Sequence, residues 1–308
     1  MKLSAYYKGL GGTVKLIDDF SEKFDIAYCS KTFNLPAVKI ILTQMPLADE
    51  IHLGGTGFAT FVIDGKERYH KNKDPALPHD IEHCYPDYGL YSDLTKNTAF
   101  GFLTRGCPNN CGFCVVSRKE GLNSVHVADL PEFWRGQPNI KLMDANLLAC
   151  DNSENLLMAL IDSKANIDFT QGVDARLVNE HNAQLLGKMK IKMIHFAFDF
   201  MTSEAEVIQG LSLFRKYSPT TCRERKVYIL TNYDTTHAED WYRVKKVMEL
   251  GFHPDVRIYR KGTHSRFLTD LTGWANFSPL YRSCLFEDYI PRKDGKRCGE
   301  LYRDILRS

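Results

Sequence analysis

Strand-like and helix-like hydrophobic patterns alternate along the middle of the chain. Short apolar runs rich in β-branched and aromatic residues predict strands, and longer amphipathic segments predict helices. The expected strands are 98–105, 140–147, 167–178, 193–200, 226–232 and 256–259. The expected helices are 128–135, 153–164, 179–190, 203–217 and 238–250, with Ser153 as an N-cap and Gly251 at the last helix C-terminus.

Six strands joined by five helical crossovers indicate an α/β fold with a parallel sheet and helices outside it. The pattern fits an open doubly wound sheet or a curved partial barrel. In both architectures, functional side chains are expected at the carboxyl ends of the strands.

The first 92 residues follow a different pattern. Short strands are expected at 14–18, 26–30 and 38–43, followed by a glycine-rich turn at 54–57. Three prolines then punctuate an extended connector at 75–91. We therefore expect a smaller domain at 1–92, a central domain at 93–268, and a C-terminal extension at 269–308.

Composition excludes several classes of protein. The 308 residues include 40 basic and 38 acidic side chains, a net charge of +2, which argues against a broad nucleic-acid-binding surface. An apolar fraction of 44% is typical of a globular protein. Because no apolar run approaches the roughly 18 residues of a membrane-spanning helix and no signal-peptide core is visible, we expect a soluble, cytoplasmic protein with no membrane partner.

Three of the nine cysteines lie within eight residues, directly after the first predicted strand. Cys107, Cys111 and Cys114 form a C-x3-C-x2-C motif. Three thiolates on one loop can bind three irons of a cubane cluster and leave the fourth iron without a protein ligand. An open metal position is typical of catalytic sites.

Two other interpretations of these cysteines remain open. A zinc site would recruit a fourth ligand such as Cys84, Cys150 or a histidine, and the protein would then be a non-catalytic zinc-binding or interaction module. Alternatively, the three thiols are buried without a metal, although the segment contains Pro108, Asn109 and other residues typical of turns.

The motif, with Phe113 before its last cysteine, resembles that of the radical S-adenosylmethionine (radical SAM) superfamily. The resemblance covers residues 95–262 and implies a partial (βα)6, TIM-barrel-like core. It implies an iron-sulfur enzyme in which Cys107, Cys111 and Cys114 bind a [4Fe-4S] cluster that chelates S-adenosylmethionine. Reductive cleavage would yield a 5′-deoxyadenosyl radical that abstracts hydrogen from an unidentified substrate, with a flavodoxin- or ferredoxin-type protein as electron donor.

The segments 25–31, 54–57 and 85–91 resemble radical enzymes with an N-terminal cobalamin-binding-type domain. That domain normally opens with a strand and a D-x-H-x-x-G loop, whereas here Asp49 and His52 have the wrong spacing and place. We therefore expect a truncated Rossmann-like domain that does not bind cobalamin. A cobalamin-dependent radical methyltransferase is the alternative within the enzyme class.

Polar residues at the predicted strand ends are further site candidates. The resemblance implies that Asp144, Asn146 and Asp199 contact S-adenosylmethionine, with Phe113 beside the cofactor. It also implies that Gln171, Asp174 and Arg176 face cofactor or substrate. The alternative for each strand-end residue is a helix cap or a loop hydrogen bond.

Overall fold

The computed structural model describes residues 1–33, 45–63, 66–260, 262, 264–292 and 295–307. Contacts divide the chain into two units. The first comprises residues 1–99 and 105–137, and the second comprises 100–104 and 138–308. The cysteine loop therefore belongs to the same unit as the N-terminal region. The domain boundaries expected at residues 92 and 268 stay predictions.

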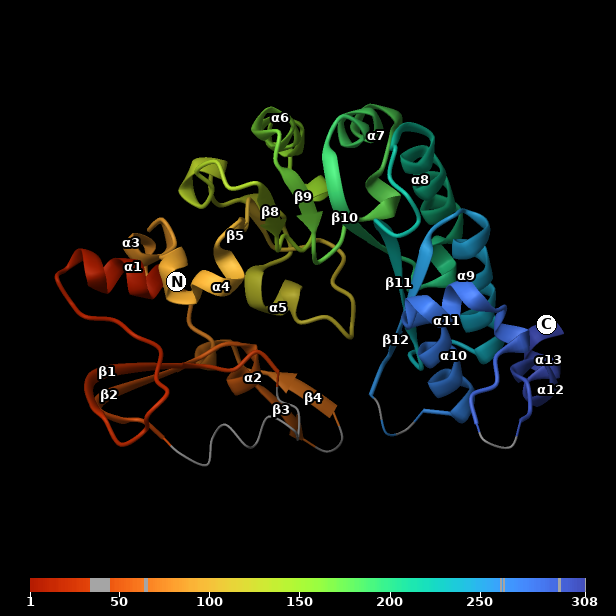
Figure 1. Ribbon diagram of the computed structural model, residues 1–308, viewed down its shortest axis with the longest axis horizontal. Helices are drawn as coiled ribbons and strands as arrows, with labels where there is room; N and C mark the ends of the chain where they lie inside the picture. Colours follow the sequence, from red (N-terminus) through yellow and green to blue (C-terminus); the bar gives the residue numbers. More distant parts are fainter. Residues whose placement is uncertain (34–44, 64–65, 261, 263, 293–294, 308) are drawn as a thin grey trace. The chain divides into compact units, whose positions relative to one another are not determined.

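The second unit is built on a six-stranded parallel sheet (Figure 1). Its spatial order follows the order in sequence. The boundary between residue 99 of the first unit and residue 100 of the second falls within its first strand. The strands are β5 (Thr98–Gly101), β8 (Asn139–Leu142), β9 (Asn166–Phe169), β10 (Lys190–Ala197), β11 (Arg225–Thr231) and β12 (His253–Ile258). The connecting helices include α6 (Ser153–Ser163), α7 (Glu180–Gly187), α8 (Glu204–Tyr217) and α9 (His237–Glu249). The α/β class and the parallel sheet are confirmed.

Local sequence signals explain both ends of α9. Thr236 and Glu239 form a capping box at the start of α9. At its end Gly251 has φ +78°, and the amides of Gly251 and Phe252 donate to Met248 and Val247, as in a Schellman motif. The Gly251 prediction is confirmed, whereas the N-cap of α6 is Asn152 and not Ser153.

Several predicted elements differ in the structure, among them the strands predicted over 98–105 and 140–147, which end at Gly101 and Leu142. The first expected helix, 128–135, is only a 3-10 turn at Leu130–Glu132, because the Asp129 and Glu132 capping box is followed by no amphipathic turn. The strand predicted over 167–178 ends at Phe169. Beyond it, Gly172 has φ +124° and the Asp174 side chain accepts a hydrogen bond from the Arg176 amide, which favours a turn.

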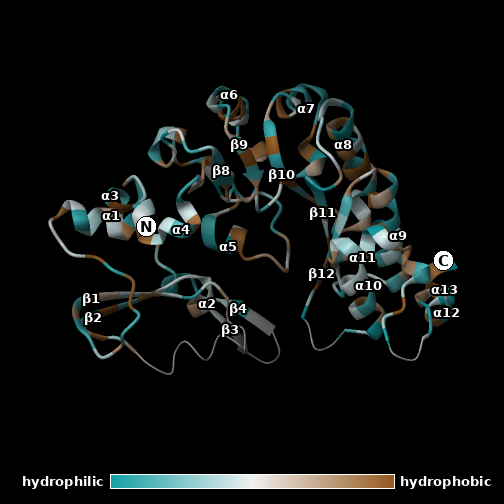
Figure 2. Cartoon of the chain, in the orientation of Figure 1, coloured by the Kyte–Doolittle hydropathy of each residue, from teal (hydrophilic) through white to brown (hydrophobic). Residues whose placement is uncertain are grey.

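The core of the second unit lies between the sheet and the helices. Alternate strand residues, such as Ile167, Phe196 and Ile229, are buried. The Phe196 ring contacts Phe214 of α8 at 5.0 Å between centroids, so this face of the sheet packs against the helices. The helices carry both hydrophobic and hydrophilic residues, as expected for such a layer (Figure 2).

In its described residues the first unit contains short elements and no complete Rossmann-like sheet. β1 (Lys23–Ser30) and β2 (Leu47–Gly54) pair in parallel, and β3 (Thr60–Ile63) and β4 (Lys66–Tyr69) form a hairpin. The unit also contains α1 (Lys2–Gly9), α2 (Thr56–Ala59), α3 (His79–Glu82), α4 (Ser92–Thr95), α5 (Val116–Glu120) and β7 (Val125–His126). The two residues of β6 (Thr104–Arg105) are divided between the units, with Thr104 in the second and Arg105 in the first. The strand predicted at 26–30 lies within β1, and 14–18 has no regular structure. The strand predicted at 38–43 lies outside the described residues.

The C-terminal extension is helical and packs on the sheet edge. It contains α10 (Arg266–Asn276), α11 (Ser278–Ser283), α12 (Cys298–Leu301) and α13 (Arg303–Arg307). The Asn276 amide bonds both backbone groups of Val256 in β12, which attaches α10 to the sheet. None of the described helices has the length and apolar character needed to cross a membrane.

Candidate metal centre and strand-end site

The cysteine loop is closed at its base by Glu120. Glu120 Oε2 accepts a hydrogen bond from the Gly106 amide at 3.1 Å, and Oε1 lies 3.2 Å from the Arg105 guanidinium. The Cys107 amide donates to Gly121 O at 3.1 Å. These bonds bring the two ends of the loop together, so the three cysteines lie on a loop that is closed at its base.

Closure of the loop requires glycine at position 106. Its φ is +91°, and a Cβ atom there would lie 2.1 Å from Asn123 O. A side chain at this position would therefore meet both backbone strain and a steric clash with the returning strand. At the loop tip Asn110, with φ +46°, is a residue type that tolerates the left-handed region.

The three thiols have the donor chemistry of a metal centre. Cys107, Cys111 and Cys114 are half-buried, and the Cys114 amide donates to Cys111 O at 2.9 Å in a tight turn. All nine cysteines lie in the described part of the chain, and none is in a disulfide. In that part of the chain no three Cys, His, Asp or Glu side chains are arranged to hold a metal ion. The three cysteines are the type of ligand that an iron-sulfur cluster requires, but in this structure they are not arranged in the geometry of metal ligands.

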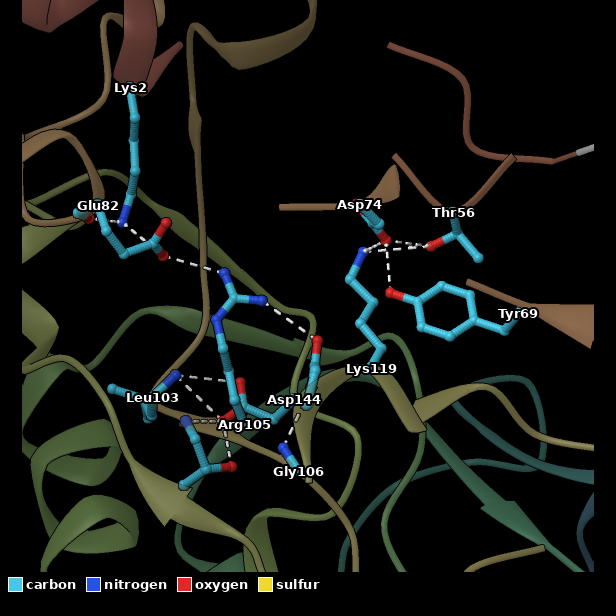
Figure 3. A network of polar contacts seen from close by, with 12 residues as sticks. Lys2, Thr56, Tyr69, Asp74, Glu82, Leu103, Arg105, Gly106, Lys119 and Asp144 are labelled. Atoms are coloured by element: carbon cyan, nitrogen blue, oxygen red, sulfur yellow. Dashed lines mark hydrogen bonds and ion pairs between the residues drawn. The ribbon is translucent and has the colours of Figure 1, made fainter. Parts of the chain in front are cut away.

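Asp144 is the most deeply buried of the predicted site carboxylates. It follows β8, is 4% exposed, and accepts hydrogen bonds from the amides of Leu103 and Thr104 and from Thr104 Oγ1 (Figure 3). Burial raises the pKa of Asp144 to about 6, against the opposing effect of these hydrogen bonds. The carboxylate thus holds backbone residues 103–104 in the second unit.

The structure brings three other predicted residues together at the strand ends. Arg176 donates to the Asp174 carboxylate through Nε at 2.9 Å and Nη2 at 2.7 Å, and Asn146 Nδ2 donates to the same carboxylate at 3.3 Å. Asn146 is 1% exposed, whereas Gln171 and Arg176 are exposed. Polar groups that follow β8 and β9 therefore share one site, as expected at the carboxyl edge of a parallel sheet.

Asp199 lies after β10 and close to this group. Its Oδ1 accepts a hydrogen bond from the Leu230 amide at 2.9 Å. Burial raises the pKa of Asp199, while the Leu230 hydrogen bond and the positive charges of Arg243 and Arg176 oppose the shift. The side chain is therefore attached to β11 and within electrostatic reach of the Asn146–Asp174–Arg176 group.

Arg243 was not among the site residues predicted from the sequence. This α9 side chain is fully buried and donates to Phe198 O, Asp199 O and Leu230 O at 2.8–2.9 Å, with Asp240 as its counter-ion at 2.6 Å. It ties the ends of β10 and β11 together. Its position among the buried Val244 and Val247, with an acidic residue three positions earlier, was the available signal.

A row of polar side chains on the sheet face opposite the helices was also missed. The His195 ring stacks on Tyr228 at 4.8 Å with an interplanar angle of 6°, and the Arg257 guanidinium lies 5.0 Å from the Tyr228 ring centroid. On the neighbouring strands Lys141 and Asp168 form an ion pair at 3.7 Å. Burial lowers the pKa of His195, which favours its neutral form. The signal was the period-two alternation of polar and apolar residues in parallel strands, which are more often apolar on both faces.

No family model matches the chain, and no curated protein matches it significantly. We therefore infer function from the residues of this chain.

Proposed function

We propose that this protein is a radical SAM enzyme that uses one [4Fe-4S] cluster. The observation that carries the proposal is the C-x3-C-x2-C loop between the first and second strands of a six-stranded parallel βα sheet whose strands follow in sequence order. This is the arrangement expected of a partial (βα)6 barrel, which we propose as the finer description of the fold.

In this proposal Cys107, Cys111 and Cys114 ligate the cluster. When bound, the cluster would supply one electron to the sulfonium of S-adenosylmethionine, giving methionine and a 5′-deoxyadenosyl radical that takes a hydrogen atom from substrate. The chain itself would orient the cofactor and exclude water from it.

The Asn146–Asp174–Arg176 group supports a cofactor site at the strand ends of the sheet. The Asp174–Arg176 pair and the Asn146 amide offer hydrogen-bonding and charged groups suited to the amino, carboxylate and ribose groups of S-adenosylmethionine. We propose Asn146, Asp174, Arg176 and Asp199 as contacts, with Phe113 and Gln171 at the periphery. Asp144, with three donors already bound, would act by holding residues 103–104.

The face that carries His195, Tyr228 and Arg257 would bind substrate. Stacked planar groups and charged side chains favour a polar substrate over an apolar one, because burying these groups against hydrocarbon would leave them without hydrogen bonds. The external electron donor would be a flavodoxin- or ferredoxin-type protein.

The decisive experiment is anaerobic reconstitution with iron and sulfide. We expect about four irons per chain and an EPR spectrum of the dithionite-reduced protein that changes when S-adenosylmethionine is added. Bound zinc with no iron signal would contradict the proposal and favour a non-catalytic zinc module.

Substitution of the motif cysteines tests their assignment. Cys107→Ala, Cys111→Ala or Cys114→Ala should each lower the formation of 5′-deoxyadenosine by roughly 100-fold or more, because each removes one of three protein ligands. Chromatography of anaerobic reactions measures the product. Cys222→Ala is the matched control, since Cys222 is an exposed cysteine outside the motif and should leave the rate unchanged. Wild-type rates in all three motif variants would contradict the assignment.

A further inference from the structure

Two ion pairs attach the cysteine loop to earlier parts of the first unit (Figure 3). Before the motif, Arg105 Nη2 lies 3.0 Å from Glu82 Oε1, and Lys2 Nζ lies 3.3 Å from the same oxygen. After the motif, Lys119 Nζ lies 2.7 Å from Asp74 Oδ2. Each end of the loop therefore has its own contact with the N-terminal region.

The Asp74 carboxylate is the centre of the second contact. Its side chain is 6% exposed, and besides Lys119 it accepts hydrogen bonds from Tyr69 Oη at 3.1 Å, the Gly55 amide at 3.2 Å and Thr56 Oγ1 at 3.4 Å. Burial and the charge of Asp74 raise the pKa of Tyr69 to about 12, so its hydroxyl remains a donor. Two donors of the glycine-rich turn, which could bind a phosphate, are thus occupied by an internal carboxylate, and the Gly57 amide donates to Lys31 O.

The turn is shaped for this contact. Gly55 has φ +94°, and a Cβ atom there would lie 2.6 Å from Lys31 O. Only glycine allows the backbone to pass so close to Lys31 while its amide points at Asp74. The turn therefore connects β2 and α2 to Asp74, which forms the ion pair with Lys119.

Lys119 is mechanically linked to the motif through α5. The Arg118 guanidinium donates to Cys114 O at 3.2 Å, and Ser117 Oγ donates to Asn110 Oδ1 at 3.0 Å. Both residues lie in the same short helix as Lys119. A shift of Lys119 would therefore move the carbonyl of the last motif cysteine and the tip of the loop.

The buried carboxylate makes this ion pair different from the others in its unit. Among the ion pairs between described residues of the first unit, Lys119–Asp74 has the least exposed carboxylate, at 6%, while Lys119 is 30% exposed; in the comparable pair Lys8–Asp87, at the same 2.7 Å, the side chains are 45% and 16% exposed. Loss of Lys119 would therefore leave a poorly solvated carboxylate.

We propose that Asp74 and Lys119 are positioning residues, and that the N-terminal region of this chain serves as a brace that holds the cysteine loop. The inference rests on the proposed function, in which the loop binds the cluster. It gives the N-terminal region a role that requires no cobalamin.

Hydrogen exchange of the full-length, metal-free protein tests the brace without the cluster. In Lys119→Met, amides of residues 106–121 should exchange about tenfold faster or more, because the loop loses its attachment. Lys119→Arg keeps the charge and should remain close to wild type. Lys8→Met removes an ion pair of equal length away from the loop and should leave loop exchange unchanged. Asp74→Asn is the second variant, and peptides of β10 and β11 report whether each variant is folded.

A second measurement separates the brace from the proposed function. After reconstitution, Lys119→Met should lose iron to a chelator about tenfold faster than wild type, while Lys119→Arg and Lys8→Met should not. Unchanged loop exchange in Lys119→Met and Asp74→Asn would overturn the brace whatever the iron content. Faster exchange with an unaltered rate of iron loss would overturn the positioning role. Wild-type protein that takes up no iron would overturn the proposed function and, with it, this role for the pair.

Discussion

At the residue scale, buried charges in the second unit bind backbone groups of distant segments. Asp144 accepts hydrogen bonds from residues 103–104, about 40 positions earlier, and Arg243 donates to three carbonyls at the ends of β10 and β11. Such charges are costly to bury unless each is matched by several hydrogen bonds. Their placement at strand ends therefore shapes the edge where we propose that the cofactor binds.

Asp144 should make stability depend on pH. Its pKa is raised from 3.8 to about 6, so the folded protein binds more protons than the unfolded chain between these values. The stability from this group is fully present below about pH 4 and is lost as the pH rises through about 6. We expect the free energy of unfolding to fall by up to about 3 kcal/mol over this range, relative to Asp144→Asn.

Urea unfolding at several pH values measures this difference. Asp144→Asn keeps the shape of the side chain and removes its titration, and the shift of Asp199 is common to both proteins, so it cancels. Parallel pH profiles of the two proteins would show that Asp144 does not titrate in this range.

At the element scale, glycines decide how closely helices approach the strand-end loops. Gly210 lies in α8, and a Cβ atom there would lie 1.8 Å from Ala175 O. Ala175 stands between Asp174 and Arg176, so α8 packs directly against the loop that presents this ion pair. Close packing at Gly210 thus holds α8 against the loop that carries the Asp174 and Arg176 side chains.

Gly210→Ala should destabilise the protein, although helix propensity alone predicts the opposite. Alanine is favoured over glycine in a helix by about 1 kcal/mol, but the clash with the Ala175 carbonyl forces the helix and loop apart. We expect a net loss of about 2 kcal/mol in the free energy of unfolding, measured in urea.

Gly273→Ala in α10 is the matched control. A Cβ atom there has Tyr289 Oη at 3.8 Å as its nearest neighbour, an ordinary contact, so propensity should prevail and stability should rise by about 0.5–1 kcal/mol. A stabilising effect of both substitutions would mean that α8 is free to move away from the loop.

At the scale of the whole molecule, the two units are interleaved in sequence. Residues 100–104 belong to the second unit, yet the chain before and after them belongs to the first. The cysteine loop therefore shares its unit with Asp74 and Glu82, which precede the central region expected from the sequence.

Removal of residues 1–92 should release the loop even though the predicted central domain is kept whole. We expect peptides covering 106–121 to exchange about tenfold faster or more, because Lys119 and Arg105 lose Asp74 and Glu82. Protection in β10 and β11 is the internal control for folding of the second unit. A shortened chain with normal protection in the loop would show that the N-terminal region is dispensable for it.

Most of the sheet could be predicted because its signals are local. The spacing of apolar residues, the capping box at Thr236 and the glycine after α9 act within one or two turns of chain, so they are visible in sequence. Strand ends were less predictable: β9 ends at Phe169 because residues beyond it form turns through side-chain hydrogen bonds.

By itself the sequence determined the α/β alternation, the parallel sheet, and the spacing of Cys107, Cys111 and Cys114, whereas the order of the strands in the sheet was seen only in the structure. Tertiary structure alone decided which partners the charged residues take: Asp144 with residues 103–104, Asp74 with Lys119, and His195 with Tyr228 on the neighbouring strand. The physical reason is range. Periodicity and capping depend on neighbours in sequence, whereas the pairing of a buried charge depends on which distant donors the packing of the whole chain brings within about 3 Å.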